Sequence, residues 1–136
     1  MTVPTSTLVN DIGDTSDVAV VILAAGQGTR FRSDTAKVLH RAAGRSLLRH
    51  VIVAVRPLAV GQVVVVVGHH AEEVAAEAHA AGVDGLTTVL QREQRGTGHA
   101  VQQAIPELAD HIRRVLVLFG DTPLLTAQAL AGLFEA

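Results

Sequence analysis

The sequence predicts an α/β domain whose mostly parallel sheet carries helices on both faces. Four short apolar runs, typical of buried strands, alternate with segments of helical periodicity. Such alternation favours right-handed β-α-β units and a parallel sheet. The expected strands cover residues 18–23, 63–67, 86–90 and 115–118. The expected helices cover residues 46–58, 71–81, 100–108 and 127–136.

Composition places the chain among globular proteins and excludes several other classes. With 136 residues, a formal net charge of -2 and 49% hydrophobic residues, it fits one folded domain. It lacks the basic excess of a nucleic-acid-binding protein, and no apolar run reaches the ~20 residues of a membrane span. Without cysteine, it has neither a disulfide framework nor a thiolate metal site. We expect a cytoplasmic protein.

The first 17 residues differ in character from the rest of the chain. They are rich in Thr, Ser, Asp and Gly and contain no lysine or arginine. A secretory signal would need a basic start and a solid apolar block, and neither is present. We therefore expect a flexible tail over 1–17, with the folded part over 18–136.

The strand expected over 18–23 ends in a glycine-rich turn followed by basic side chains. Leu23-Ala24-Ala25-Gly26 leads to Gly28, so the backbone can approach a ligand closely. Arg30 and Lys37 then supply cations suited to phosphate, and Lys37 is the only lysine in the chain. Neither the dinucleotide fingerprint nor the P-loop fits the glycine spacing. A plain strand-to-helix turn is the alternative interpretation of the two glycines alone.

A second candidate site follows the strand expected over 86–90. Gln91 lies at the carboxyl end of that strand, and Gly96 and Gly98 flank Thr97 just before a helix. Ligands of open α/β sheets gather at such carboxyl ends. A glutamine side chain offers the donor and acceptor that pair with a uracil edge. By itself, the segment is equally well explained as the glycine-containing start of a helix.

Asp121 is the third candidate, directly after the strand expected over 115–118. The preceding Gly120 lets the chain pass close to a ligand. Magnesium takes one or two carboxylates together with phosphate oxygens and water, so one aspartate suffices beside a nucleotide. Local hydrogen bonding in a turn is the alternative role. The pair His69-His70 is interpreted as ordinary loop histidines, because no third metal ligand lies at a useful spacing.

Three motifs together resemble one enzyme family. They are L-A-A-G-Q-G-T-R at 23–30, K-V-L-H at 37–40 and Q-x-x-x-x-G-T-G-H-A at 91–100. The chain resembles the sugar-1-phosphate nucleotidyltransferases, and most of all the uridyltransferase domains of bacterial bifunctional enzymes that also carry an acetyltransferase domain. The resemblance implies a Rossmann-like fold and transfer of a uridylyl group from UTP to N-acetylglucosamine 1-phosphate. The products would be UDP-N-acetylglucosamine, a cell-envelope precursor, and pyrophosphate.

The resemblance also implies roles for individual residues. Arg30 and Lys37 would be catalytic and steady the phosphates, and Asp121 would hold Mg²⁺. Two positions depart from the family pattern, since Phe119 replaces a frequent tyrosine and Ala36 replaces a proline. The residues implied to contact the nucleotide are Leu23, Ala24, Ala25, Gly26, Gly28, Gln91, Gly96, Thr97, Phe119 and Gly120.

Family catalytic domains are longer than this chain, so we expect a fold that is incomplete at its C-terminus. The distal part, which binds most of the sugar, has no counterpart here, and catalysis is expected to be weak or absent. The unpaired sheet edge is an expected aggregation hazard, although self-association is not predicted. Two alternatives stay open. One is a relative acting on another sugar phosphate or on molybdopterin, and the other is a non-catalytic nucleotide-binding module.

Overall fold

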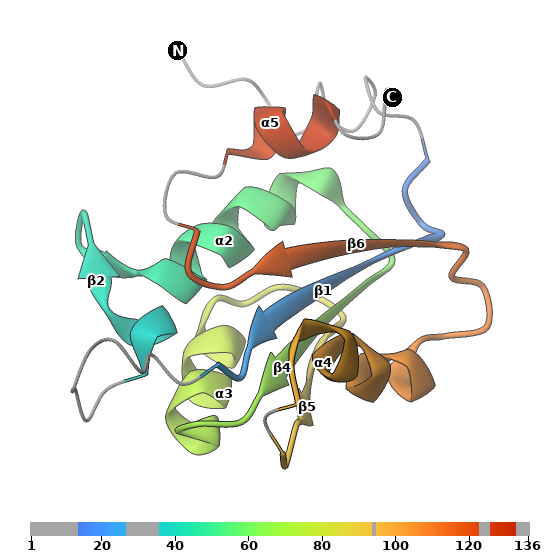
Figure 1. The fold of residues 1–136 in the computed structure, drawn as a ribbon. Coiled ribbons are helices and arrows are strands. Elements are labelled where there is room, and N and C mark those ends of the chain that lie inside the picture. The colour runs from blue at the N-terminus through green and yellow to red at the C-terminus, as the bar shows by residue number, and fades with distance from the viewer. Residues whose placement is uncertain (1–13, 27–35, 94, 123–125, 133–136) are drawn as a thin grey trace.

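A computed structural model of the chain describes residues 14–26, 36–93, 95–122 and 126–132. Its main sheet has four strands in the order β5-β4-β1-β6, and every neighbouring pair is parallel. The predicted α/β class and parallel sheet are therefore confirmed (Figure 1). The strands are β1 (Val18–Ala24), β4 (Gln62–Val67), β5 (Leu86–Leu90) and β6 (Arg114–Phe119).

Strands β1 and β4 form the buried centre of the sheet. In β4, Val63, Val64, Val65 and Val66 are at most 1% exposed, and Val67 is 4% exposed. Helices cover both faces, so these strands read as continuous apolar runs without polar alternation. Each buried valine contributes roughly 1.5–3 kcal/mol of transfer free energy. The apolar run thus explains both the existence and the central position of this strand.

The two faces of the sheet are covered unequally. Helices α2 (Leu47–Val55), α3 (Ala71–Ala80) and α5 (Ala127–Gly132) pack on one face, whereas α4 (Thr97–Ala104) packs on the other (Figure 1). The first face holds the larger core, built from side chains of all three helices. On the second face, Ala100 and Ala104 of α4 lie against alternate residues of β1 and β4. The larger core therefore anchors the domain.

Two helix boundaries differ from the sequence prediction. The helix expected over 46–58 begins after Ser46, whose Oγ accepts from the Arg49 amide, and changes to a 3-10 turn, η2 (Arg56–Leu58), at Pro57. Helix α4 begins at Thr97, three residues before the expected start at Ala100. It continues into a second 3-10 turn, η3 (Ile105–Glu107).

A short hairpin was not predicted. Strands β2 (Arg41–Ala42) and β3 (Arg45–Ser46) are antiparallel and joined by Ala43 and Gly44, both with positive φ. Positive φ at both turn residues is the geometry of a tight two-residue hairpin. Two-residue strands leave too short a pattern to detect, so the sequence offered no periodic signal. The 3-10 turn η1 (Lys37–Leu39) precedes this hairpin.

Part of the predicted tail belongs to the folded unit. Thr15 is 3% exposed, and its hydroxyl donates to the carbonyl oxygen of Leu58 at 2.8 Å. Gly61 permits this packing, because a Cβ there would overlap the Ser16 carbonyl. Asp17 accepts from the Arg114 guanidinium at 2.7 Å. Residues 14–17 therefore lie against the domain, and residues 1–13 fall outside the described part of the chain.

Strand β6 presents an apolar stripe to solvent. Val115, Val117 and Phe119 lie on the α4 face of the sheet and are 46%, 37% and 52% exposed. Helix α4 packs on β1 and β4 and does not bury these side chains. Within the described residues β6 pairs only with β1, which leaves it as an edge strand. In that same part of the chain, no helix has the length and apolar character needed to cross a bilayer.

Replacing Asp17 with Asn should flatten the acid dependence of stability. The hydrogen bond from Arg114 holds the pKa of Asp17 below its usual 3.8. The unfolded chain therefore binds protons more readily, and stability that is present above about pH 4 is lost as the pH falls. Urea unfolding between pH 3 and 7 should show a shallower decline for Asp17→Asn than for the exposed control Asp110→Asn. Equal slopes for the two variants would contradict this assignment.

Matched Val→Thr changes should distinguish the centre of the sheet from its edge. Val65 is fully buried and Val117 is 37% exposed. A hydroxyl placed in the apolar centre without a partner costs about 1–3 kcal/mol. Val65→Thr should therefore lower the free energy of unfolding by that amount, and Val117→Thr should change it by less than about 0.5 kcal/mol. Similar losses in both variants, measured by chemical unfolding, would argue against this strand order.

Candidate functional site

Candidate residues follow the carboxyl ends of three of the four strands. Ala25 and Gly26 follow β1, Gln91 follows β5, and Gly120 and Asp121 follow β6. Because all four strands are parallel, these residues share one edge, where ligands of open α/β sheets bind. Of the predicted site residues, Gly28 and Arg30 lie outside the described part of the chain.

Lys37 and Asp121 form an ion pair at this edge. The Lys37 Nζ atom lies 3.0 Å from Asp121 Oδ2, and the side chains are 43% and 34% exposed. Lys37 begins η1, between Ala36 and Val38, which are 1% and 6% exposed. Burial of both neighbours fixes the backbone on either side of the lysine and leaves its ammonium in solvent. The expected phosphate ligand and the expected metal ligand are thus in direct contact.

Gly120 makes this contact possible. Its amide donates to the Leu23 carbonyl oxygen at 2.9 Å, which extends the pairing of β6 with β1 beyond Phe119. A Cβ on Gly120 would lie 3.2 Å from both that oxygen and the Val38 Cγ1 atom. The absence of a side chain lets η1 pack this closely on the two strand ends without displacing a neighbouring atom. The glycine therefore determines where the neighbouring carboxylate lies.

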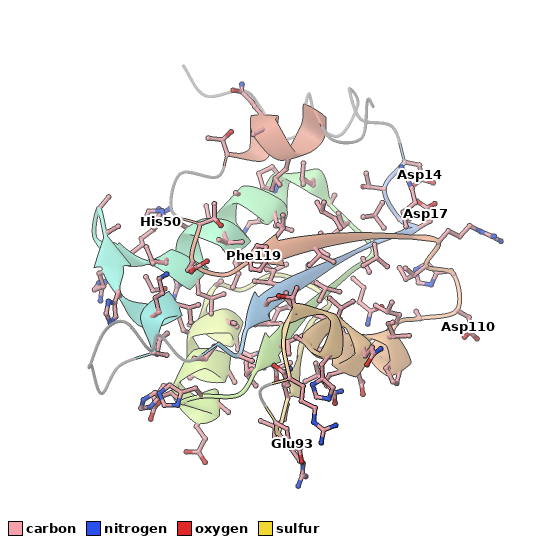
Figure 2. All side chains as sticks on the ribbon, in the orientation of Figure 1. Asp14, Asp17, His50, Glu93, Asp110 and Phe119 are labelled. Atoms are coloured by element: carbon pink, nitrogen blue, oxygen red, sulfur yellow. The ribbon has the colours of Figure 1, made fainter. Side chains whose placement is uncertain are left out.

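The end of β1 offers backbone to a ligand. Ala24 and Ala25 are 1% and 3% exposed, so their side chains belong to the core. Gly26 is exposed, and no atom lies within 4 Å of a Cβ built on it. Phe119, 52% exposed, pairs in register with Leu23 near the end of β6 (Figure 2). A nucleotide bound where β1 and β6 end would contact main-chain groups, with the ring of Phe119 beside them.

Gln91 is buried and bonded within the protein. It is 3% exposed, and its backbone amide donates to the Val67 carbonyl oxygen at 2.7 Å. Its side-chain Nε2 lies 2.9 Å from His99 Nδ1 and 3.4 Å from the Gly96 carbonyl oxygen. The amide nitrogen is therefore engaged by protein atoms, and the contact of Gln91 with a base stays a prediction. Thr97, also expected to contact the base, is exposed at the start of α4.

Two histidines near the site were not among the predicted residues. His99 contacts Gln91, and the only sequence signal for it was its place in the G-T-G-H-A motif. The His69 amide lies 3.4 Å from the Ala25 carbonyl oxygen, beside the end of β1. His70 Nδ1 is 2.9 Å from Glu73 Oε2, at the start of α3. The sequence placed His69 and His70 in a loop but contained no signal that this loop borders the site.

The donor set at this edge suits a hard cation brought by a nucleotide. Asp121 supplies one carboxylate, and the described residues contain no cluster of three or more metal-ligating side chains. Mg²⁺ commonly binds through one or two carboxylates together with substrate phosphates and water. The described part of the chain therefore fits an ion that arrives with phosphate oxygens and offers it no closed cage of protein ligands. Binding would require Lys37 to release Asp121, to which it is paired.

Comparison with known proteins identifies a family that the sequence matches. Residues 20–136 match the family described as the MobA-like NTP transferase domain. The bifunctional protein GlmU of Stutzerimonas stutzeri is 53% identical over 116 residues, which cover 85% of this chain and 25% of that protein. The chain thus spans about a quarter of the length of this curated relative.

Solved structures agree on the fold. The structure of Rv0371c from Mycobacterium tuberculosis H37Rv matches with a TM-score of 0.73 and 22% identity, covering 90% of this chain and 61% of that one. The 4-diphosphocytidyl-2C-methyl-D-erythritol synthase of Anaerococcus prevotii matches with a TM-score of 0.72 and 14% identity, covering 95% of this chain and 52% of that one. At such identities the likeness establishes the fold alone.

Gly120→Ala should destabilise the domain, whereas Gly26→Ala should not. A methyl group at residue 120 meets backbone and a core side chain at 3.2 Å, and one at residue 26 meets open space. Overpacking of this kind costs about 1–3 kcal/mol, against less than about 0.5 kcal/mol expected for the control. Chemical unfolding of both variants measures the difference. A tolerated Gly120→Ala would show that η1 does not pack tightly on the strand ends.

Proposed function

The chain belongs to the family of MobA-like NTP transferase domains, and from this we propose that it binds a nucleoside triphosphate along the carboxyl edge of its sheet. The base would lie at Gln91, beyond β5, and the phosphates would lie at Lys37 and Asp121, beyond β1 and β6. The observation that carries the proposal is the Lys37–Asp121 pair of 3.0 Å. This pair would present a cation to phosphate and a carboxylate to a metal, and Gln91 lies at the carboxyl end of β5, on the other side of the sheet.

We further propose that the triphosphate is UTP and that the acceptor is N-acetylglucosamine 1-phosphate. Support comes from the three motifs described above and from 53% identity to a protein named bifunctional protein GlmU. In this reaction a phosphate oxygen of the acceptor attacks the α-phosphorus of UTP. The bond between that phosphorus and the oxygen bridging it to the β-phosphate breaks. UDP-N-acetylglucosamine forms and pyrophosphate leaves. A role in cell-envelope precursor synthesis in the cytoplasm is part of the same proposal.

The residues of the site would act by position and charge. Lys37 would turn from Asp121 to the phosphates, and with Arg30 it would stabilise negative charge that develops on the leaving pyrophosphate. Asp121 would hold Mg²⁺, which supplies further neutralisation of phosphate charge when bound. Main-chain groups of Gly26 and Gly28, with the preceding Leu23-Ala24-Ala25 segment, would line the phosphates, and Phe119 and Gly120 would line the opposite wall. Such chemistry depends mainly on alignment of the reacting groups.

Nucleotide binding and transfer are separable parts of the proposal. The chain spans 25% of the length of the GlmU relative, so sugar binding and full turnover are proposed for the longer architecture of that relative. An alternative within the same family is transfer to another sugar phosphate or to molybdopterin. A nucleotide-binding module without turnover is the second alternative. Base selectivity tests the first alternative, and pyrophosphate release tests the second.

Titration calorimetry with UTP and Mg²⁺ tests the nucleotide site. Lys37→Met should weaken binding roughly 10- to 100-fold, because one charge-assisted contact to phosphate contributes about 1.5–3 kcal/mol. The matched control Arg113→Met removes a cation directly before β6, at the opposite edge of the sheet, and should leave the affinity unchanged. Absence of UTP binding, or equal losses in the two variants, would contradict the proposed site.

A further inference from the structure

The amide of Gln91 is held from two sides by its own loop and helix. Its Nε2 atom lies 2.9 Å from His99 Nδ1 and 3.4 Å from the Gly96 carbonyl oxygen. A primary amide nitrogen has two hydrogens, and these two contacts use both of them. Since Gln91 is 3% exposed, its side chain has little room to choose another position. Both hydrogens of the Gln91 Nε2 atom are therefore engaged by protein atoms before any ligand binds.

The Gly96 carbonyl determines which way the amide points. A carbonyl oxygen can only accept, so the Gln91 atom facing it must be the NH₂ group, whichever way the two terminal atoms are assigned. Gly96 has φ +95 and ψ -179, a conformation open to glycine and strained for residues with a side chain. This backbone conformation orients the carbonyl toward Gln91. The orientation of the amide thus follows from chemistry and local geometry together.

The same contact determines the tautomer of His99. Because Gln91 donates to Nδ1, that nitrogen must carry the lone pair, and the proton must lie on Nε2. Gln103 lies 3.3 Å from His99 Nε2, a longer contact than the 2.9 Å to Gln91. A neutral imidazole accepts at one nitrogen only, so the shorter contact is the hydrogen bond. The Gln103 Nε2 atom also lies 3.4 Å from the His99 carbonyl oxygen, so this amide donates to the backbone and not to the ring.

One atom of the Gln91 side chain remains for a ligand. Within the described residues its Oε1 accepts no hydrogen bond, and none of their buried side-chain oxygens lacks a partner. The oxygen therefore keeps some contact with solvent at the carboxyl end of β5, although Gln91 as a whole is 3% exposed. It can only accept a hydrogen bond. A ligand group at this point has to be a donor.

We propose that His99 is a positioning residue that, with the Gly96 carbonyl, locks the Gln91 amide so that its oxygen faces the nucleotide base. The inference rests on the proposed nucleotide site and identifies what determines its base preference. A pyrimidine with an N–H in its ring, such as uracil, matches an acceptor, whereas cytosine presents an unprotonated ring nitrogen at the same position. Sites built around one hydrogen bond discriminate strongly against ligands that leave it unpaired.

The tautomer of His99 can be tested without any nucleotide. Two-bond ¹H–¹⁵N correlation NMR of the full chain above pH 7 reports which imidazole nitrogen is protonated. We expect the Nε2–H tautomer for His99 in the parent protein and an averaged signal in Gln91→Leu. The Nδ1–H tautomer, or averaging in the parent protein, would overturn the proposal whatever the chain binds.

Two amide substitutions of His99 test the consequence for base selection. His99→Asn keeps an acceptor close to the position of Nδ1, whereas His99→Gln moves the amide one bond farther and removes that acceptor. Calorimetry with UTP and CTP should show the parent preference for UTP retained in His99→Asn and reduced about 3- to 10-fold in His99→Gln, the effect of one lost hydrogen bond. Equal loss in both variants, or loss in neither, would overturn the inference. Failure of the parent chain to bind UTP would instead overturn the nucleotide site and leave the tautomer test intact.

Discussion

The parallel pairing of β1 with β4 on one side and β6 on the other determines where the described candidate residues at the ends of β1 and β6 lie. Leu23 of β1 is in register with Val66 of β4 and Phe119 of β6, so the three strands end at nearly the same level. Their buried side chains resist any slip, because a shift by one residue would break the close packing of both sheet faces against the helices. The site at the strand ends is therefore a consequence of core packing and does not depend on ligand binding for its position.

The Lys37–Asp121 pair explains how opposite charges can share the site before a ligand binds. Both side chains are more than a third exposed, and exposed ion pairs contribute only about 0–1 kcal/mol. Exchange of this contact for phosphate oxygens and a cation thus sacrifices little stability. Meanwhile the pair keeps the only lysine of the chain near the strand ends, which lowers the entropy that phosphate binding would otherwise have to overcome.

The sequence predicted the elements of the sheet better than the contacts of the site. Continuous apolar runs identify buried strands, as in 63–67, and helical spacing identifies most helices. Lys37 and Asp121 were each predicted from their chemistry, but 84 positions separate them (121 minus 37), and their contact depends on the strand order. Likewise, the start of α4 depends on the φ of Gly96, and the orientation of the Gln91 amide depends on His99. These properties arise from spatial arrangement, which a local pattern does not encode.

Two glycines at the site act through different physical effects. Gly120 allows close approach of η1 to the strand ends, and Gly96 directs a carbonyl toward the Gln91 amide. They lie beyond β6 and β5, the two outer strands, which are three strand spacings or about 14 Å apart. In the proposed site, charge neutralisation and base selection would therefore be supported by separate parts of the fold. On the proposed arrangement, changes between β5 and α4 would alter the preferred base while the phosphate end kept its geometry, so that one scaffold could serve different nucleotides.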